Sequence, residues 1–249
     1  MIKKIILAIS ITILFFVYYI SNKKNIITES TNLIVGTNAE YQPFTFIKNN
    51  KISGFDISLI KKICKKLNKK IELRDLPFDI LIPEIQRNSI DIIAAGITPT
   101  KERENILCFS KCYFTGDPLV IVSNKNTQLK TIDELIDKNV IVNDGYTADF
   151  YISSLQGPRI IRLSNPASAF LALESGKAQA YVAAKSTVTP YLKQYDKSFI
   201  LNIIPNTEEK YALAISNKNK ALIPQINSYI DQMEKDGTLN KLKEKWGLV

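Results

Sequence analysis

The sequence predicts an α/β protein with mostly parallel sheets. Short apolar runs alternate with amphipathic segments from about residue 33 to the end of the chain, which is the pattern of strands joined by helices. The content of 45% hydrophobic and 23% charged residues is ordinary for a globular protein. The 249 residues are enough for one large or two modest domains. Ligands of such sheets bind beyond the carboxyl ends of the strands, so the segments that follow strands are examined for a site.

Short apolar runs bounded by turn residues predict the strands. The first pair is separated by a turn at Asn49 and Asn50, and the run at 90–94 is apolar enough to be fully buried. The predicted strands cover residues 33–37, 44–47, 71–73, 90–94, 119–123, 140–142, 160–163, 180–183, 199–203 and 211–215.

Helices are predicted from apolar residues that recur on one face. Asp56 can cap a helix whose lysines lie opposite its apolar face, and Thr131 with Glu134 forms a capping box. Thr100 can cap a short turn that carries Arg103. The other helices are expected at 78–87, from 148 onward, from 166 to a stop at Gly176, and as two C-terminal helices separated by Gly237.

Residues 1–24 are predicted to be a secretory signal peptide or an uncleaved N-terminal anchor. Lys3 and Lys4 precede an apolar run at 5–20, as in an export signal. The end of the run lacks a small-x-small cleavage site, so retention as an anchor stays open. Either outcome places the rest of the protein in the periplasm or another extracytoplasmic space, touching the membrane only through this segment.

The composition excludes several classes of site. The chain has no histidine, which rules out histidine acid–base catalysis, a Ser–His–Asp triad and histidine metal ligands. The three cysteines contain no CxxC pair, so neither a metal site nor another cofactor is expected, and Cys108 and Cys112 could bridge only if the chain turns between them. The net charge of +9 is not gathered into a basic stripe with aromatic residues, which argues against nucleic-acid binding.

The segment after the predicted strand 90–94 contains residue types suited to a carboxylate. Gly96 leaves its backbone open to a ligand, and Thr98 offers a hydroxyl. Arg103, on the turn that Thr100 caps, could present two parallel donors to a carboxylate. The alternative is that Arg103 is a solvated helix charge, and spacing alone does not decide between the two.

Two further segments follow predicted strands. Residues 143–147 open a helix, where free amide groups could hold an anion or Thr147 could act as a plain cap. Tyr41 and Phe44 surround a proline after the first strand, and each could cover a ligand or pack in the core.

Taken in order, these segments resemble a known family, the polar amino-acid-binding proteins of bacterial ABC uptake transporters, which are extracellular solute-binding proteins of family three. The resemblance runs from about residue 33 to 248. It rests on Val35-Gly36-Thr37, Tyr41-Gln42-Pro43-Phe44, Gly54-Phe55-Asp56, Ala95-Gly96-Ile97-Thr98-Pro99-Thr100-Lys101-Glu102-Arg103, Phe109-Ser110 with Tyr113, Gly145 before a helix, and Lys245-Trp246-Gly247.

The resemblance implies a two-lobed, type II-like periplasmic binding protein with two mostly parallel sheets and a cleft between the lobes. Lobe 1 would comprise residues 33–116 and 207–249, and lobe 2 residues 117–206. The implied function is that of a monomeric solute-binding component of an ABC importer. It would bind an amino acid or related small carboxylate, pass it to the transporter permease, and catalyse no reaction.

The resemblance also assigns the ligand-binding residues. Arg103 would hold the ligand α-carboxylate, with Gly96 and Thr98 binding through backbone and hydroxyl. Thr147 would lie at the helix N-terminus of lobe 2. The remaining positions are Tyr41 and Phe78, whose rings would sandwich the ligand side chain, and Asn38 and Asn143, which would read its polar end.

One position departs from the family pattern. Ala184, with Lys185 beside it, stands where family members usually have an aspartate that pairs with the ligand ammonium. A buried ammonium without a counter-charge costs several kcal/mol. Either an acid elsewhere takes over this role, or the ligand carries a second anionic group near Lys185. The candidate acids are Glu40, Asp117, Asp144 and Asp149.

The alternative function is an exported enzyme on the same scaffold, because relatives of this family dehydrate cyclohexadienyl acids such as arogenate. Such an enzyme needs a carboxylic acid over the ring, and Glu40 is the candidate in this sequence. The sensing domain of an anchored receptor is a third possibility, which we rank below these two.

Overall fold

The computed structural model describes residues 32–194 and 198–248. The predicted signal or anchor at 1–24 lies outside these residues. Within the described part of the chain, no helix combines the length and apolar character needed to cross a membrane. The alternation of strands and helices confirms the predicted α/β class.

The outer strands of the large sheet are parallel and belong to two groups. In lobe 1, β1 pairs in parallel with β6, and in lobe 2, β9 pairs in parallel with both β10 and β11. The bounds are β1 (Asn32–Thr37), β5 (Lys70–Asp75), β6 (Ile92–Ile97), β9 (Asn139–Asn143), β10 (Arg159–Leu163) and β11 (Ala180–Ala184). β6 and β11 are buried along their whole length, as expected for strands covered on both faces.

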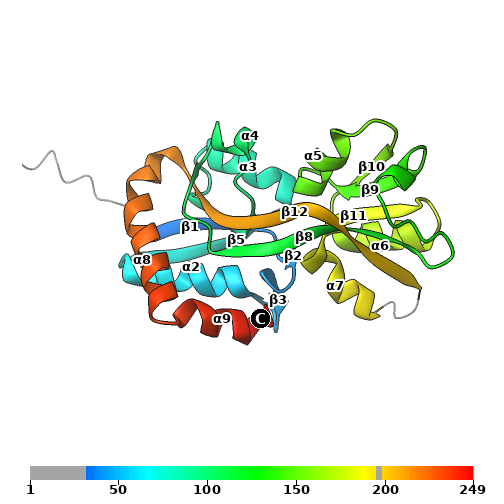
Figure 1. Cartoon of the computed structure of the whole chain (residues 1–249). Coiled ribbons are helices and arrows are strands. Elements are labelled where there is room, and N and C mark those ends of the chain that lie inside the picture. The colour runs from blue at the N-terminus through cyan, green and yellow to red at the C-terminus, as the bar shows by residue number, and fades with distance from the viewer. Residues whose placement is uncertain (1–31, 195–197, 249) are drawn as a thin grey trace, which may run out of the picture. The chain divides into compact units, whose positions relative to one another are not determined.

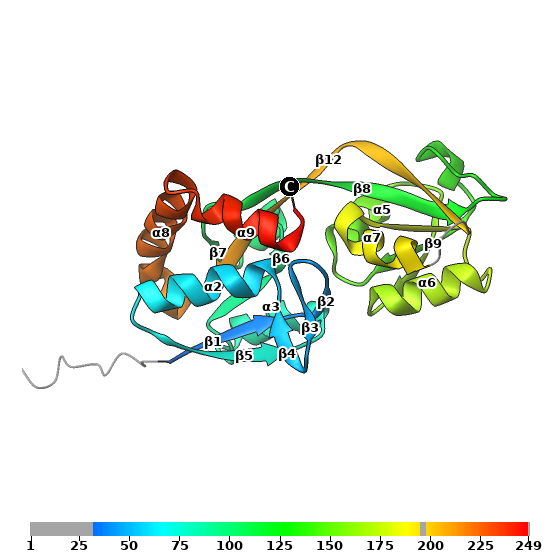
Figure 2. The ribbon, with the colours of Figure 1, turned by 90° about the horizontal axis from the view of Figure 1, so that it is seen from below.

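Two long strands, β8 (Phe114–Asn124) and β12 (Phe199–Ile215), run through both lobes and join them (Figures 1 and 2). The prediction of separate strands at 199–203 and 211–215 was wrong. β12 is continuous because it pairs with β8 over most of its length and with β6 at its end, with a register shift between Ile203 and Glu208. These pairings are antiparallel, so the sheet order is β10-β9-β11-β8-β12-β6-β1-β5 with mixed directions.

Helices cover the sheet in each lobe (Figure 1). Those of lobe 1 are α2 (Phe55–Lys66), α3 (Phe78–Gln86), α4 (Lys101–Glu104), α8 (Ile223–Lys235) and α9 (Thr238–Trp246). Lobe 2 contains α5 (Thr147–Ser153), α6 (Pro166–Glu174) and α7 (Lys185–Gln194). The short elements are β2 (Glu40–Tyr41), β3 (Thr45–Lys48), β4 (Lys51–Ser53), β7 (Cys108–Phe109), η1 (Asp133–Leu135) and η2 (Asn217–Leu222).

Three local predictions differ from the structure. Gly54, rather than Asp56, is the N-cap of α2, and Asp56 lies buried in its first turn. At the predicted capping box only the glutamate half forms: Glu134 accepts from the amides of Lys130 and Thr131, and the helix is a single 3₁₀ turn. Helix α7 was not predicted, because Pro190 interrupts its sequence.

The apolar core is divided between the lobes. In lobe 1, α2, α8 and α9 pack on one face of the sheet and α3 on the other. In lobe 2, α5 covers one face, and α6 and α7 the other. All three cysteines are unpaired. The predicted lobe boundary at residue 117 falls on β8, and the one at residue 206 falls on β12 within its register shift. These boundaries stay a prediction.

Candidate functional site

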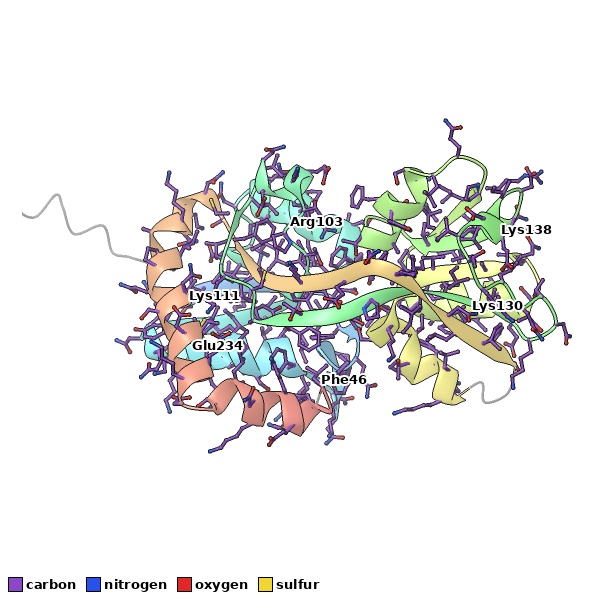
Figure 3. All side chains as sticks on the ribbon, in the orientation of Figure 1. Phe46, Arg103, Lys111, Lys130, Lys138 and Glu234 are labelled. Carbon is purple, nitrogen blue, oxygen red and sulfur yellow. The ribbon has the colours of Figure 1, made fainter. Side chains whose placement is uncertain are left out.

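Arg103 is buried, with 3% of its surface exposed, on the side of lobe 1 that faces α5 (Figure 3). Its helix α4 begins as predicted, with the Thr100 hydroxyl accepting from the Arg103 amide at 3.3 Å. The guanidinium donates from Nη1 to the Thr98 carbonyl and from Nη2 to the Gly145 carbonyl, both at 2.9 Å. The alternative of a solvated helix charge is therefore wrong for Arg103.

The charge of Arg103 is compensated only at longer range, because Glu209 and Glu102 raise its pKa without forming an ion pair with it. The guanidinium carbon lies 5.6 Å from the ring centre of Phe78 and 5.7 Å from that of Phe150. Burial lowers the pKa of Arg103 to about 10, so the side chain remains a cation at neutral pH. Within residues 32–194 and 198–248 no carboxylate forms an ion pair with it, and its buried Nε has no acceptor. A desolvated cation in this state attracts an anion.

Arg103 lines a pocket formed by residues of both lobes and of β12. Gly96 of lobe 1 and Thr147 of lobe 2 are among its lining residues, and Glu209 of β12 contributes the only carboxyl group among the described ones. The complete lining is Tyr41, Phe78, Ala95, Gly96, Arg103, Tyr146, Thr147, Ala148, Ala184, Thr187 and Glu209.

Gly96 is required by the geometry of this pocket. Its φ of +61° lies in the left-handed region, and a Cβ placed there would stand 2.4 Å from Cε1 of Tyr41. The Gly96 amide donates to Oδ2 of Asp56 at 2.7 Å, and the Tyr113 hydroxyl donates to the same oxygen at 2.7 Å. Burial raises the pKa of Asp56 to about 7. Asp56 thus positions the end of β6 that carries Gly96.

Tyr41 belongs to a buried hydrogen-bond network that joins the two lobes. Its hydroxyl donates to Oδ2 of Asp117 at 3.1 Å and hydrogen-bonds the Ser186 hydroxyl at 2.8 Å. The Tyr211 hydroxyl donates to Oδ2 of Asp117 at 2.7 Å and also contacts that of Tyr41. Asp117 accepts the Ser186 amide at 3.0 Å as well. The network holds the edge of the Tyr41 ring, which faces the pocket.

The structure brings five of the eight predicted site residues together. Tyr41, Phe78, Gly96, Arg103 and Thr147 line the pocket. A sixth, Thr98, is linked to it, because its hydroxyl donates to the Glu209 carboxylate at 2.5 Å.

The two predicted asparagines do not line this pocket. Asn38 accepts from the Tyr146 hydroxyl at 3.2 Å and lines a separate pocket beside Glu40. Asn143 is buried in lobe 2, where it donates to the Leu163 carbonyl at 3.1 Å and accepts from the Tyr181 hydroxyl. Both amides therefore already have protein partners.

None of the four acids considered as replacements for position 184 lines the pocket. Glu40 and Asp144 are exposed, and Asp117 is used by the network around Tyr41. Asp149 accepts from the Gly145 amide at 3.2 Å and pairs with Arg162 at 3.0 Å. Lys185 is exposed and lies outside the pocket lining, unlike its neighbour Ala184.

Sequence reasoning missed three lining residues that have polar side chains, Tyr146, Thr187 and Glu209. Glu209 is 6% exposed, and burial raises its pKa, while the hydroxyls of Thr147 and Thr98 hydrogen-bond its carboxyl. The hydroxyl of Thr187 is buried without a partner. No spacing or motif in the sequence distinguishes Glu209 from its exposed neighbour Glu208.

The described residues contain no group of three or more acidic or cysteine side chains arranged to hold a metal ion. The chemistry available in the pocket is one buried cation, one buried carboxyl group, three aromatic rings and the unpartnered hydroxyl of Thr187. This set suits a small polar molecule that carries a carboxylate.

Comparison with known proteins agrees with this arrangement. The chain is 30% identical over 219 residues to the arginine-binding extracellular protein ArtP of Bacillus subtilis (strain 168), covering 86% of this chain and 85% of ArtP. An ancestral arginine-binding protein bound to arginine superposes with a TM-score of 0.81 at 35% identity, over 87% of this chain and 98% of that one. The ancestral amino acid-binding protein AncCDT-1, a precursor of cyclohexadienyl dehydratase, superposes with a TM-score of 0.79 at 33% identity, over 88% and 97% of the two chains.

The family model for bacterial extracellular solute-binding proteins, family 3, matches residues 33–249. This match covers every element of both lobes, including the loop from Gly96 to Arg103. The chain belongs to the bacterial extracellular solute-binding proteins of family 3.

Proposed function

We propose that this chain binds an amino acid in the pocket around Arg103 and delivers it to the permease of an ABC transporter. The observation that carries the proposal is the buried guanidinium of Arg103, which forms no ion pair with any described residue and has an unpaired Nε. A ligand carboxylate would give this cation a counter-charge and its N–H group an acceptor. The relatives named above bind amino acids, which supports the same class of ligand here.

The pocket residues take roles that follow from their positions. Arg103 holds the α-carboxylate, and the rings of Tyr41 and Phe78 flank the rest of the ligand. The backbone of Gly96 and the hydroxyls of Thr98 and Thr147 supply further hydrogen bonds. Asn38 acts on the ligand through Tyr146, which lines the pocket, whereas Asn143 and its partner Tyr181 lie outside the lining.

Closure of the lobes makes binding and conformation depend on each other. The Arg103–Gly145 and Tyr146–Asn38 hydrogen bonds each connect a residue of lobe 1 with one of lobe 2. Bringing these groups together removes water from Arg103, which strengthens its attraction to a carboxylate. A ligand that contacts both lobes therefore favours the closed arrangement, and the permease can distinguish loaded from empty protein.

The proposal includes a location and an assembly state. Family members are extracellular or periplasmic. We place the body of this protein outside the cytoplasmic membrane as a monomer, with residues 1–24 acting as a signal peptide or a retained anchor. The net charge of the first 24 residues and their apolar run support export.

The chain is proposed to catalyse no reaction. AncCDT-1, a relative that is a precursor of an enzyme, is itself described as an amino acid-binding protein. Glu40, the sequence candidate for an acid in a dehydratase, is exposed and lies outside the pocket around Arg103. Turnover of prephenate or arogenate by the purified protein would overturn this part of the proposal.

Isothermal titration calorimetry with the common amino acids tests the function. We expect at least one to bind, and Arg103→Gln to weaken it by roughly a hundredfold or more, because a buried charge pair is broken. Arg87→Gln is the matched control, since Arg87 lies on the surface of the same lobe with its side chain 65% exposed. Absence of binding by the wild type, or equal affinity of Arg103→Gln, would contradict the proposal.

A further inference from the structure

We infer that Glu209 supplies the counter-charge for the ligand ammonium, so that the pocket selects zwitterionic α-amino acids. This inference rests on the proposed function and adds to it the residue that recognises the amino group. It is carried by the joint burial of Glu209 and Arg103 in one pocket beside an alanine at position 184.

The charges of the pocket are complementary to a zwitterion. Apart from the phenols, Arg103 is the only base and Glu209 the only acid among the described lining residues. The two side chains are not within ion-pair distance of each other. A molecule with adjacent carboxylate and ammonium groups can therefore satisfy both. A simple carboxylate would pair with Arg103 but leave a buried carboxylate without a cation, which is costly.

A second acceptor lies in the same pocket. An ammonium group has three N–H donors and no acceptor, so it needs several oxygen atoms around it. The hydroxyl oxygen of Thr187 is buried, 3% exposed as a residue, and has no partner among the described residues. Thr187 lies on α7, three residues after Ala184. Its unpartnered hydroxyl oxygen therefore lies on the side of the pocket where Ala184 supplies no acid.

Among the described lining residues, Arg103 is the only cation, and its charge lowers the pKa of Glu209 without forming an ion pair with it. The Glu209 carboxylate accepts from the neutral hydroxyls of Thr98 and Thr147, and no lysine lines the pocket among the described residues. The N-terminus of helix α7 carries a partial positive charge, which would repel the ligand ammonium. Asp117 offsets this charge, because its carboxylate accepts the Ser186 amide at 3.0 Å. Burial raises the pKa of Glu209, and a bound ammonium opposes that shift by favouring the ionised form.

The position of Lys185 does not support the alternative of a ligand with a second anionic group. A second anionic group on the ligand was considered because Lys185 follows Ala184 in the sequence. Lys185 is exposed and borders a different pocket, on the side of Pro43 and Trp246. A dianionic ligand in the pocket around Arg103 would instead place its second charge near Glu209.

Calorimetry on two ligands separates the roles of the two ionisable groups. The probes are the common amino acid that binds the wild type most tightly and its desamino analogue, which keeps the carboxylate. Glu209→Gln keeps the shape of the side chain, and Glu208→Gln on the exposed neighbouring position is the matched control. We expect Glu209→Gln to weaken the amino acid by about thirtyfold or more and to leave the desamino analogue unchanged or tighter. Glu208→Gln should alter neither.

Other outcomes overturn the inference in distinguishable ways. Retained amino-acid affinity in Glu209→Gln, with loss in Arg103→Gln, would reject the role of Glu209 and keep the proposed function. Wild-type protein that binds no amino acid would reject both. If Glu209→Gln does not unfold cooperatively, the variant is not properly folded, and a crystal structure of the wild type with its bound amino acid serves as the test instead. The ligand nitrogen is then expected within about 3.2 Å of the Glu209 carboxylate, and a separation above about 4 Å rejects the inference.

Discussion

The guanidinium of Arg103 donates to the carbonyl oxygen of Gly145 at 2.9 Å, and this bond connects helix α4 with the turn after β9. The helix and the turn each follow a buried strand, one in each lobe. The residue that is proposed to hold the ligand carboxylate is thus also a contact between the lobes. Ligand binding and lobe closure use the same side chain, and substitutions near it should change both.

Gly96→Ala is expected to lower both stability and ligand affinity. The new methyl group would meet the Tyr41 ring at 2.4 Å, and the φ of +61° is unfavourable for alanine. We expect a loss of about 2 kcal/mol or more in the free energy of unfolding and at least a tenfold loss of affinity, measured by urea denaturation and calorimetry. Gly176→Ala is the control, because Gly176 has a φ of +73° but open space around it, so only the backbone cost of about 1 kcal/mol remains. Equal effects of the two substitutions would show that contact with Tyr41 is unimportant.

Asp56→Asn is expected to flatten the pH dependence of stability. The pKa of Asp56 is raised by burial from 3.8 to about 7, so the folded state keeps its proton over a range in which the unfolded state has lost it. Stability of the wild type should therefore fall as pH rises from about 4 to about 7, by up to roughly 4 kcal/mol from this group. Urea denaturation across this range should give a smaller decline for Asp56→Asn. Parallel curves for the two proteins would contradict the assignment.

Tyr41→Phe is expected to weaken the network that joins the lobes while keeping the aromatic ring. The substitution removes the hydrogen bonds to Asp117 and Ser186, which are buried or partly buried. We expect the free energy of unfolding to fall by about 1–2 kcal/mol. Tyr229→Phe is the control, because its hydroxyl makes one hydrogen bond at the surface and its loss should cost less than about 0.5 kcal/mol. Unchanged stability of Tyr41→Phe would mean that Asp117 is satisfied without it.

The three cysteines are expected to differ in reactivity. Cys64 is buried, and burial raises the pKa of its thiol to about 11, whereas Cys108 and Cys112 are partly exposed. A disulfide reagent such as DTNB should modify two thiols in the native protein and all three after denaturation without reductant. A count of one thiol in the denatured protein would reveal a bridge between Cys108 and Cys112.

Some features of the site could be predicted from local sequence. The cap of α4 by Thr100 depends on neighbouring residues alone, and it fixes the direction in which Arg103 leaves the loop. Gly96 was predicted as a site residue because no side chain shields its backbone from a ligand, and the structure adds that its φ lies in the left-handed region. The two C-terminal helices and their separation at Gly237 were confirmed, since an amphipathic period and a left-handed glycine are local signals.

Other features depend on contacts between distant segments. β12 was predicted as two strands, because its centre is polar and its continuity comes from pairing with β8 and then β6. The same pairing carries Glu209 to the pocket, more than a hundred residues along the chain from Arg103. Asn38 and Asn143 were expected in the pocket but lie outside its lining, where their side chains accept hydrogen bonds from the hydroxyls of Tyr146 and Tyr181.

The α/β class, the order of most elements and the segment that presents Gly96 and Arg103 could be predicted from the chain alone. These features follow from periodicity, capping and the residue types of short segments. The burial of Arg103 without an ion pair, and the presence of Glu209 in the same pocket, could be learned only from the folded protein. Burial and charge pairing are properties of the space between segments, and that space exists only once β8 and β12 have joined the lobes.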